Sequence, residues 1–355
     1  MNRPVLLLAV GLLGAVPLLS AAPGGKKMVL EGVDRYRVCE AMFEAVRVVL
    51  SYRGEQYSPA YIQGRSGAAF RVAGPCPCAP TCSTQMDTPA LVKLLGYAVE
   101  SVTLTEDQRD QVPKLIERIK EEVRAGRPVI VWNAFTNAEW DVVCGFDDEK
   151  KQFVGRGSYQ GLDDYARADQ NRLTEGFGIC GFTGALFIGK KTGKLEDRQA
   201  ERAALEEAVR HARTPAEPLP DTPDGGEPPW RFREGLACYD AWARGFRADP
   251  RKVPGPGDRY PLSIYRSTHR AAADFLHEIA AKHPRAKAHL ERAAEHFAAD
   301  ADCLDECYWK LMQGWEGWKE PDPAKAARAA ALLGQARDHY AQEIAAIERA
   351  LASGL

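Results

Sequence analysis

Histidine is absent from the first 210 residues of this chain, although the 355-residue sequence contains seven histidines. All seven lie between His211 and His339. Histidine is the side chain that most often serves as a general base near neutral pH. Its absence therefore excludes a local histidine base from the N-terminal half, and any such group would have to come from the C-terminal half.

An excess of basic residues is also absent. Lysine and arginine together number 47 and aspartate and glutamate 49, which gives a net charge of −2. A nucleic-acid-binding protein usually carries a basic domain, so no nucleic-acid partner is expected. Apolar residues at 45% and charged residues at 27% are close to the globular average, and the length is sufficient for two domains.

Long apolar runs are absent after the N-terminal segment. Residues 5–20, "VLLLAVGLLGAVPLLS", form an apolar core that glycine and proline interrupt, and two alanines follow. This pattern predicts a signal peptide at 1–22 and export to the periplasm or the extracellular space. An uncleaved membrane anchor is the alternative. No other membrane association is expected.

Nine cysteines are present, and in an exported protein disulfide bonds are their usual role. Because nine is odd, at least one thiol stays unpaired within a monomer. Three of them lie in "CPCAPTC" at 76–82, which predicts a disulfide-stapled loop, with a zinc or iron–sulfur site as the alternative.

A second group of metal-ligand residue types shares one predicted helix face: His296, Asp300, Cys303 and Cys307. Cysteines on this face that bond to a neighbour such as Cys238 are the favoured interpretation. No metal or cofactor is therefore expected.

Residues 30–192 mix helical and strand patterns and predict one α/β domain. The expected helices cover about 38–53, 88–95 and 112–125, and the expected strands lie at 68–72, at 129–131, in a hairpin over 140–155 and from 184 onward. A connecting helix is expected at 195–213, and a proline-rich linker at 214–229. Apolar stripes with helical spacing then predict an all-α bundle over 230–355.

Four segments of the first half carry a resemblance to a known family. They are "CEAMFEAVRVVLSYRG" from Cys39, "GRSGAAFRV" from Gly64, "GRPVIVW" from Gly126 and "EWDVVCGFDDEKKQFVGRGSY" from Glu139. Their order resembles the papain-like cysteine peptidases, in particular the peptidase domains of bacteriocin-exporting ABC transporters and the N-terminal domain of butirosin biosynthesis protein H. The resemblance covers about 160 residues and implies an α+β papain-like domain with a nucleophilic cysteine at the start of a helix.

Two departures from the family pattern bear on catalysis. The family nucleophile lies thirteen residues before the glycine that ends the helix, which corresponds to Ala41, whereas Cys39 lies fifteen before Gly54. Glu139 stands at the position of the family histidine, with Asp141 two residues later. Since cysteine is a nucleophile only as its thiolate, carboxylates at this place oppose its activation.

Cys39 therefore has three interpretations. It is half of a disulfide or a buried small side chain, a catalytic thiol whose base comes from the helical half, or a relic of a lost active site. The favoured function is an exported, non-catalytic papain-like module that binds a peptide or small ligand. A cysteine hydrolase or an acyl or aminoacyl transferase using Cys39, with Glu139 and Asp141 in the histidine region, is one alternative. A disulfide-stapled structural envelope protein is the other.

Candidate ligand-binding residues surround two glycine-containing segments and the start of the hairpin: Arg65, Ser66, Trp140, Arg156 and Ser158. Arginines and exposed backbone N–H groups in such segments can receive a carboxylate or phosphate. The alternative is that the glycines only permit tight turns. A possible ligand shelf of Tyr308, Trp309, Trp315 and Trp318 has closure of the helical bundle as its alternative.

Overall fold

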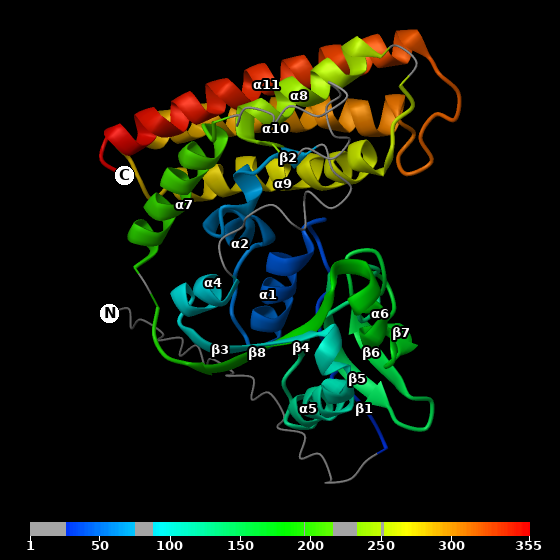
Figure 1. Ribbon diagram of the computed structural model, residues 1–355. Coiled ribbons are helices and arrows are strands. Elements are labelled where there is room, and N and C mark those ends of the chain that lie inside the picture. Colours follow the sequence, from blue (N-terminus) through cyan, green and yellow to red (C-terminus); the bar gives the residue numbers. More distant parts are fainter. Residues whose placement is uncertain (1–25, 75–87, 195, 216–232, 250–251) are drawn as a thin grey trace, which may run out of the picture.

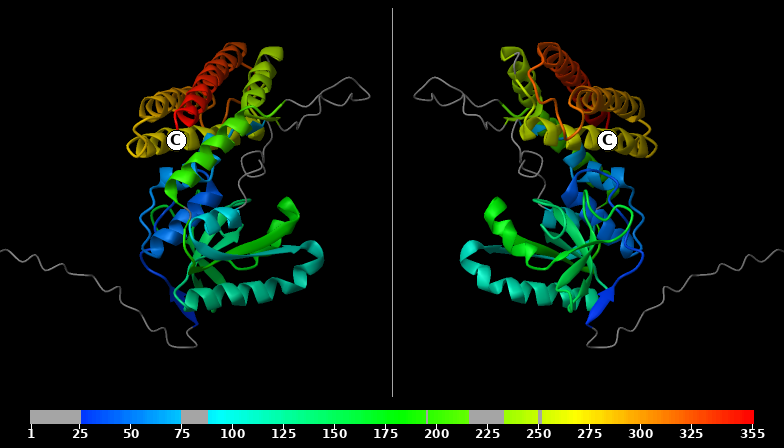
Figure 2. Two further views of the ribbon diagram at one scale, coloured as in Figure 1. Left: turned by 90° about the vertical axis from the view of Figure 1, so that its left-hand side faces the viewer. Right: turned by 90° about the vertical axis from the view of Figure 1, so that its right-hand side faces the viewer.

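The computed structural model describes residues 26–74, 88–194, 196–215, 233–249 and 252–355. In this part of the chain, a β-sheet with its own helices lies below a layer of long helices (Figure 1). The mixed α/β class predicted from the sequence is confirmed. Figure 2 shows that the two layers meet along one side, where α1 and α2 lie between them.

The larger sheet has seven antiparallel strands in the order β3-β8-β4-β5-β6-β7, with β1 also paired to β5. These strands are β1 (Lys27–Val29), β3 (Tyr97–Thr105), β4 (Val129–Trp132), β5 (Trp140–Asp147), β6 (Gln152–Arg156), β7 (Ala166–Asp169) and β8 (Phe182–Lys191). The predicted hairpin is confirmed: β5 pairs with β6, and Phe146 lies opposite Phe153. β4 is fully buried, as its run of Val, Ile, Val and Trp predicts.

The prediction of a strand at 68–72 is wrong. The chain instead forms a short 3-10 helix, η1 (Ala68–Phe70), followed by a two-residue strand, β2 (Ala73–Gly74). Gly67 enters η1 with a φ of 79°, a conformation that glycine adopts without steric cost. β2 pairs with β9 (Arg233–Glu234), which is far away in the sequence.

The helices of the α/β half are α1 (Ala41–Tyr52), α2 (Pro59–Arg65), α4 (Thr88–Leu94), η2 (Glu106–Gln111), α5 (Val112–Arg124) and α6 (Arg172–Cys180). α1 contacts β4 and β5, and its apolar side chains Phe43, Val46 and Val49 are fully buried. The apolar face that the sequence predicts for the helix at 38–53 therefore packs in the hydrophobic core of the α/β half.

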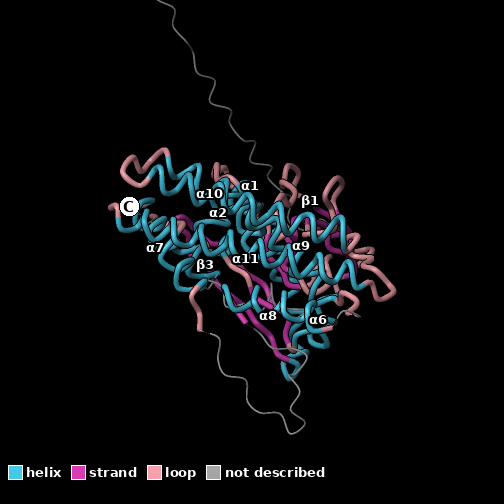
Figure 3. The backbone as a smooth tube through the Cα atoms, turned by 90° about the horizontal axis from the view of Figure 1, so that it is seen from above, coloured by secondary structure: helices cyan, strands magenta, loops and turns pink. Residues whose placement is uncertain are grey.

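The upper layer contains α7 (Asp197–Ala212), α8 (Gly235–Ala248), α9 (Pro256–Ala280), α10 (Lys287–Asp305), the π-helical turn η3 (Glu306–Leu311) and α11 (Pro323–Ala352). α10 packs against both α9 and α11, and α11 also contacts α8 and α7. The view from above in Figure 3 shows these helices crossing over the sheet. Among the described helices, none combines the length and apolar character that a membrane span requires.

The hydrophobic core of the α/β half and that of the helical layer are not formed by two separate stretches of sequence. Phe70 and Val72 belong to the core of the helical layer, together with α8–α11. The Tyr340 hydroxyl donates to the Phe70 carbonyl at 2.7 Å, which fixes α11 to η1. The segment containing α2 and η1 is therefore held by contacts with distant helices.

Several sequence predictions fall on residues that the structure does not describe. The predicted signal peptide at 1–22, the cysteine cluster at 76–82 and all but two residues of the linker at 214–229 lie outside the described ranges. The six cysteines inside those ranges are free thiols: Cys39, Cys144, Cys180, Cys238, Cys303 and Cys307.

Candidate functional site at the start of helix α1

Cys39 lies immediately outside helix α1, because Glu40 caps the helix. The Glu40 carboxylate accepts hydrogen bonds from the backbone N–H groups of Met42 and Phe43, at 3.0 and 2.8 Å. These bonds satisfy N–H groups that have no partner within the helix. The first helical residue is Ala41, the position to which the family pattern assigns the nucleophile.

The Cys39 thiol is partly buried against helix α9. Its backbone N–H donates to the Ser267 hydroxyl of α9 at 3.2 Å. Burial raises the pKa of the thiol more than the positive charge of Arg266 lowers it, and the Glu139 carboxylate raises it further. The thiol is therefore protonated at neutral pH, and this surrounding does not activate it as a nucleophile.

No histidine in the described part of the chain hydrogen-bonds to Cys39. His269 is fully buried, and its ring contacts the Asp300 carboxylate and, at 3.0 Å, the Arg71 carbonyl. His296 faces His339 at 3.3 Å. His277 is exposed on α9. The bases that the sequence offered for Cys39 are thus engaged elsewhere or face solvent.

Glu139 is buried where the sheet meets α9. It directly precedes β5, and its carboxylate hydrogen-bonds to the Tyr260 hydroxyl of α9. Burial, helped by the carboxyl groups of Glu40 and Asp141 and opposed by the hydrogen bond from Tyr260, raises the pKa of Glu139 to about 8. At neutral pH Glu139 is therefore largely a neutral carboxylic acid, which lowers the cost of keeping it away from water.

Asp141 fixes the loop that precedes β5. Its Oδ2 atom accepts the backbone N–H groups of Phe135 and Thr136, at 2.6 and 2.9 Å. Burial raises the pKa of Asp141 to about 7. Gly157 packs tightly against this carboxylate and loop: a Cβ atom added there would overlap Asp141 Oδ1 and would lie 2.5 Å from the Thr136 hydroxyl oxygen. Asp141 thus stabilises the conformation of this loop.

The structure does not bring the predicted ligand-binding arginines together. Arg65 is buried beside α7, where one of its N–H groups bonds to the Tyr61 hydroxyl at 3.1 Å and to Asp197 at 3.3 Å. Arg156 donates to the Val33 carbonyl and stacks 4.1 Å from the centre of the Tyr165 ring. Each guanidinium is bonded within its own region, although two nitrogens of Arg65 have no hydrogen-bond partner among the described residues.

The other three predicted ligand-binding residues, Ser66, Trp140 and Ser158, lie within the folded protein. The Ser66 hydroxyl donates to the Gln63 carbonyl at 2.8 Å. Trp140 packs edge-on against Trp132, with ring centres 5.3 Å apart. Ser158 is buried, and its hydroxyl has no hydrogen-bond partner among the described residues. None of these three groups reaches out to solvent as a ready ligand contact.

Four aromatic side chains are grouped here under the name aromatic rim: Tyr159, Tyr260, Trp309 and Trp315. Trp309 is 56% exposed, Trp315 is 47% exposed and Tyr159 is 36% exposed. The Trp315 ring lies 6.4 Å from that of Tyr159 and 6.0 Å from that of Tyr260. Arg266, which acts on the Cys39 thiol, lies 5.0 Å from the Trp309 ring.

The sequence pointed to Trp309 and Trp315 but not to their partners. Tyr159 follows the hairpin, and Tyr260 lies 121 residues after the Glu139 that it contacts. No local pattern links such distant positions. The local sequence around Tyr260 gives only a weak indication of a site: Tyr260 shares one side of its helix with two polar residues, Ser263 and Ser267.

Comparisons of the sequence with models of protein families and with curated proteins find no match. The candidate site therefore rests on its own geometry.

Proposed function

We propose that this protein is an exported, non-catalytic module that binds a peptide or small ligand at the aromatic rim. The proposal includes a papain-like origin for the α/β half and a bundle arrangement for α8–α11. The observation that carries it is the exposure of Trp315 next to Tyr260, which makes a part-buried contact with Glu139, together with the exposure of Trp309 six residues earlier.

Two exposed tryptophans within one short segment, at 309 and 315, favour a binding surface. Such rings offer a large apolar contact area with little conformational entropy to lose, and they are enriched at binding hot spots. Trp309 also lies in η3, and π-helical turns occur frequently at functional sites. Arg266 beside Trp309 is already paired with Asp305 at 3.0 Å, so the ligand contacts offered here are mainly aromatic.

The absence of an activating group supports a binding function over catalysis. A cysteine nucleophile needs a lowered pKa or an adjacent base. Burial and Glu139 act in the opposite direction on Cys39. Among the described residues, the polar group that bonds to Cys39 is the Ser267 hydroxyl, which is not a base at neutral pH.

Peptide selection tests the binding proposal. A phage-displayed random peptide library is selected on the purified full chain, and a selected peptide is labelled with fluorescein for anisotropy titration. We expect Trp315→Ala and Trp309→Ala to weaken binding about tenfold or more. Ile179→Ala removes another exposed apolar side chain, on α6, and serves as the control that keeps full affinity. Equal affinity of all four proteins for the peptide would refute the proposal.

Thiol labelling tests the non-catalytic part. At pH 6 an unactivated thiol is less than about 1% thiolate, so iodoacetamide labels it slowly. Cys180 is exposed and supplies an internal reference within the same chain. We expect Cys39 to label more slowly than Cys180. Faster labelling of Cys39, together with loss of a hydrolase or transferase activity in Cys39→Ser, would establish the enzyme alternative instead.

A further inference from the structure

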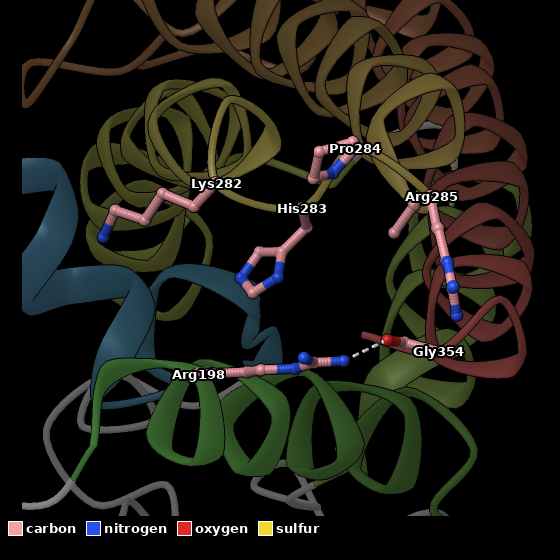
Figure 4. A pocket seen from close by; sticks show the side chains of 7 residues that line it. Arg198, Lys282, His283, Pro284, Arg285 and Gly354 are labelled. Atoms are coloured by element: carbon pink, nitrogen blue, oxygen red, sulfur yellow. Dashed lines mark hydrogen bonds between the residues drawn. The ribbon is translucent and has the colours of Figure 1, made fainter.

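A basic pocket lies between α7, the loop from α9 to α10 and the end of α11. Its volume is about 360 Å³. The residues that line it are Arg198, Lys282, His283, Pro284, Arg285, Ala286 and Gly354, and none of them is acidic (Figure 4). This pocket is built from elements other than those that carry the aromatic rim and Cys39.

Two arginines approach the same point of the pocket from different elements. In Figure 4 the side chains of Arg198 and Arg285 reach toward Gly354, and the His283 ring points into the space between the loop and Arg198. An Arg198 N–H donates to the Gly354 carbonyl oxygen. Within the described part of the chain, Arg285 has neither an ion pair nor a hydrogen bond.

Glu201, a carboxylate that contacts two residues of this pocket, is already engaged. Glu201 of α7 is fully buried, and it bonds to Lys282 at 2.8 Å and to the His283 Nε2 atom at 2.7 Å. Glu201 therefore balances the charge of Lys282 and holds the His283 ring in place. Among the described residues, neither Arg198 nor Arg285 forms an ion pair with a carboxylate, which favours an anion in the pocket.

The start of helix α10 adds to this positive potential. α10 begins at Lys287, and its cap residue Ala286, which lines the pocket, provides no side-chain hydrogen bond to the first turn. The first N–H groups of a helix have no partner within it and carry a partial positive charge. An oxyanion in the pocket can therefore meet guanidinium groups and the positive end of a helix together.

We propose that this pocket binds a phosphate group, either inorganic phosphate or the phosphate of a small monoester. Arginine forms paired hydrogen bonds with phosphate oxygens, which suits the two convergent side chains. The volume is in the range of small-molecule pockets and exceeds that of a bare ion, so a monoester fills it better.

Calorimetric titration of the full chain tests this proposal at constant ionic strength, with sodium chloride as the reference. One arm uses inorganic phosphate and the other uses glycerol 3-phosphate. We expect both to bind, the ester more tightly. Arg285→Gln should weaken binding about tenfold, which corresponds to the loss of one charge-assisted contact. Arg167→Gln, an exposed arginine on β7, is the matched control and should bind as the wild type does.

Folding is checked separately by thermal unfolding. Because Arg285 has no partner within the described residues, Arg285→Gln should keep the wild-type melting temperature. Arg198→Gln is a second variant and should also weaken binding. Tight phosphate binding that persists in both pocket variants would overturn the proposal. The absence of binding by either probe to the wild-type chain would overturn it as well.

Discussion

Two groups of buried ionisable side chains differ in their access to solvent. The junction cluster consists of the buried Glu139 and Asp141 and the half-buried Glu40, and Glu139 contacts Tyr260 of the aromatic rim. The core cluster consists of Tyr239, His269, Asp300 and Glu343, one from each of α8, α9, α10 and α11. Burial raises the pKa of Glu139 in the first and of Glu343 in the second.

A perturbed pKa alone therefore does not mark a binding site in this molecule. The side chains of His269, Asp300 and Glu343 are fully buried, whereas Glu139 contacts Tyr260, whose ring lies next to the exposed Trp315. Structural networks perturb pKa values as functional sites do. What separates the two clusters is the exposed aromatic surface beside the first.

The polar groups of Tyr239, His269 and Asp300 in the core cluster have hydrogen-bond partners, whereas those of Glu343 have none in the described part of the chain. The Arg71 carbonyl can only accept, so the His269 Nε2 atom carries a proton, and the Nδ1 atom faces Asp300. The Tyr239 hydroxyl lies 3.0 and 3.1 Å from the two Asp300 oxygens. Within the described residues both oxygens of Glu343 lack a partner, and burial raises its pKa, so this group is a neutral acid.

The largest expected effect is the loss of Asp300. Asp300→Ala leaves His269 and Tyr239 without their shared acceptor in a buried place, and we expect it to lower the free energy of unfolding by about 3–5 kcal/mol. Urea denaturation followed by circular dichroism measures this. Glu343→Gln keeps the shape of an already neutral group and should change the free energy by less than about 1.5 kcal/mol. A larger cost for Glu343→Gln than for Asp300→Ala would contradict this account.

A pH series distinguishes Glu139 from the rest of the chain. In the unfolded chain Glu139 has its ordinary pKa of 4.5, and in the folded chain its pKa is about 8. Between these two pH values the folded state therefore holds a proton that the unfolded state has released. Stability from this group is fully present below pH 4.5 and is lost as pH rises toward 8. Glu139→Gln removes the effect.

We therefore expect Glu139→Gln to gain on the order of 3 kcal/mol in unfolding free energy relative to wild type between pH 5 and pH 8. Urea titrations of both proteins at the two pH values measure the difference, in which titrating groups that do not interact with Glu139 cancel. A constant difference across this range would show that Glu139 is not held as a neutral acid.

The smallest expected effects come from two matched tyrosines. Tyr239→Phe removes hydrogen bonds to a buried carboxyl group and should cost about 2 kcal/mol in unfolding free energy. Tyr260→Phe removes the contact with Glu139 from a partly exposed ring and should cost about 1 kcal/mol. Thermal unfolding compares them. If only Tyr239→Phe reduced binding of the selected peptide, the assignment of binding to the aromatic rim would be wrong.

Local sequence patterns predicted the elements whose contacts are themselves periodic. The inward positions of α1 and α5 recur with helical spacing, and the hairpin of β5 and β6 alternates around a polar turn. β3 was missed because it is an edge strand with few buried residues. The strand expected at 68–72 failed because Phe70 and Val72 are apolar for another reason: they pack against distant helices.

The candidate site was predictable only in part, because its contacts also join residues that are far apart in the sequence. The resemblance to a known family drew attention to Cys39 and Glu139, and the sequence placed Trp309 and Trp315 among possible ligand contacts. The contact of Tyr260 with Glu139 and that of Ser267 with Cys39 join residues 121 and 228 positions apart. Such pairs depend on how helices cross the sheet, which no short pattern encodes.

The attachment of η1 to the helical layer has a consequence for the order of folding during synthesis. Phe70 is bonded to Tyr340, 270 residues later, and the backbone at Ala73 is bonded to Tyr265. A ribosome must therefore complete nearly the whole chain before this early segment can reach its final contacts. Pairings of such long separation form slowly because of the entropy of closing the loop. Until α9 and α11 emerge, Phe70 and Val72 remain available to chaperones or to other nascent chains.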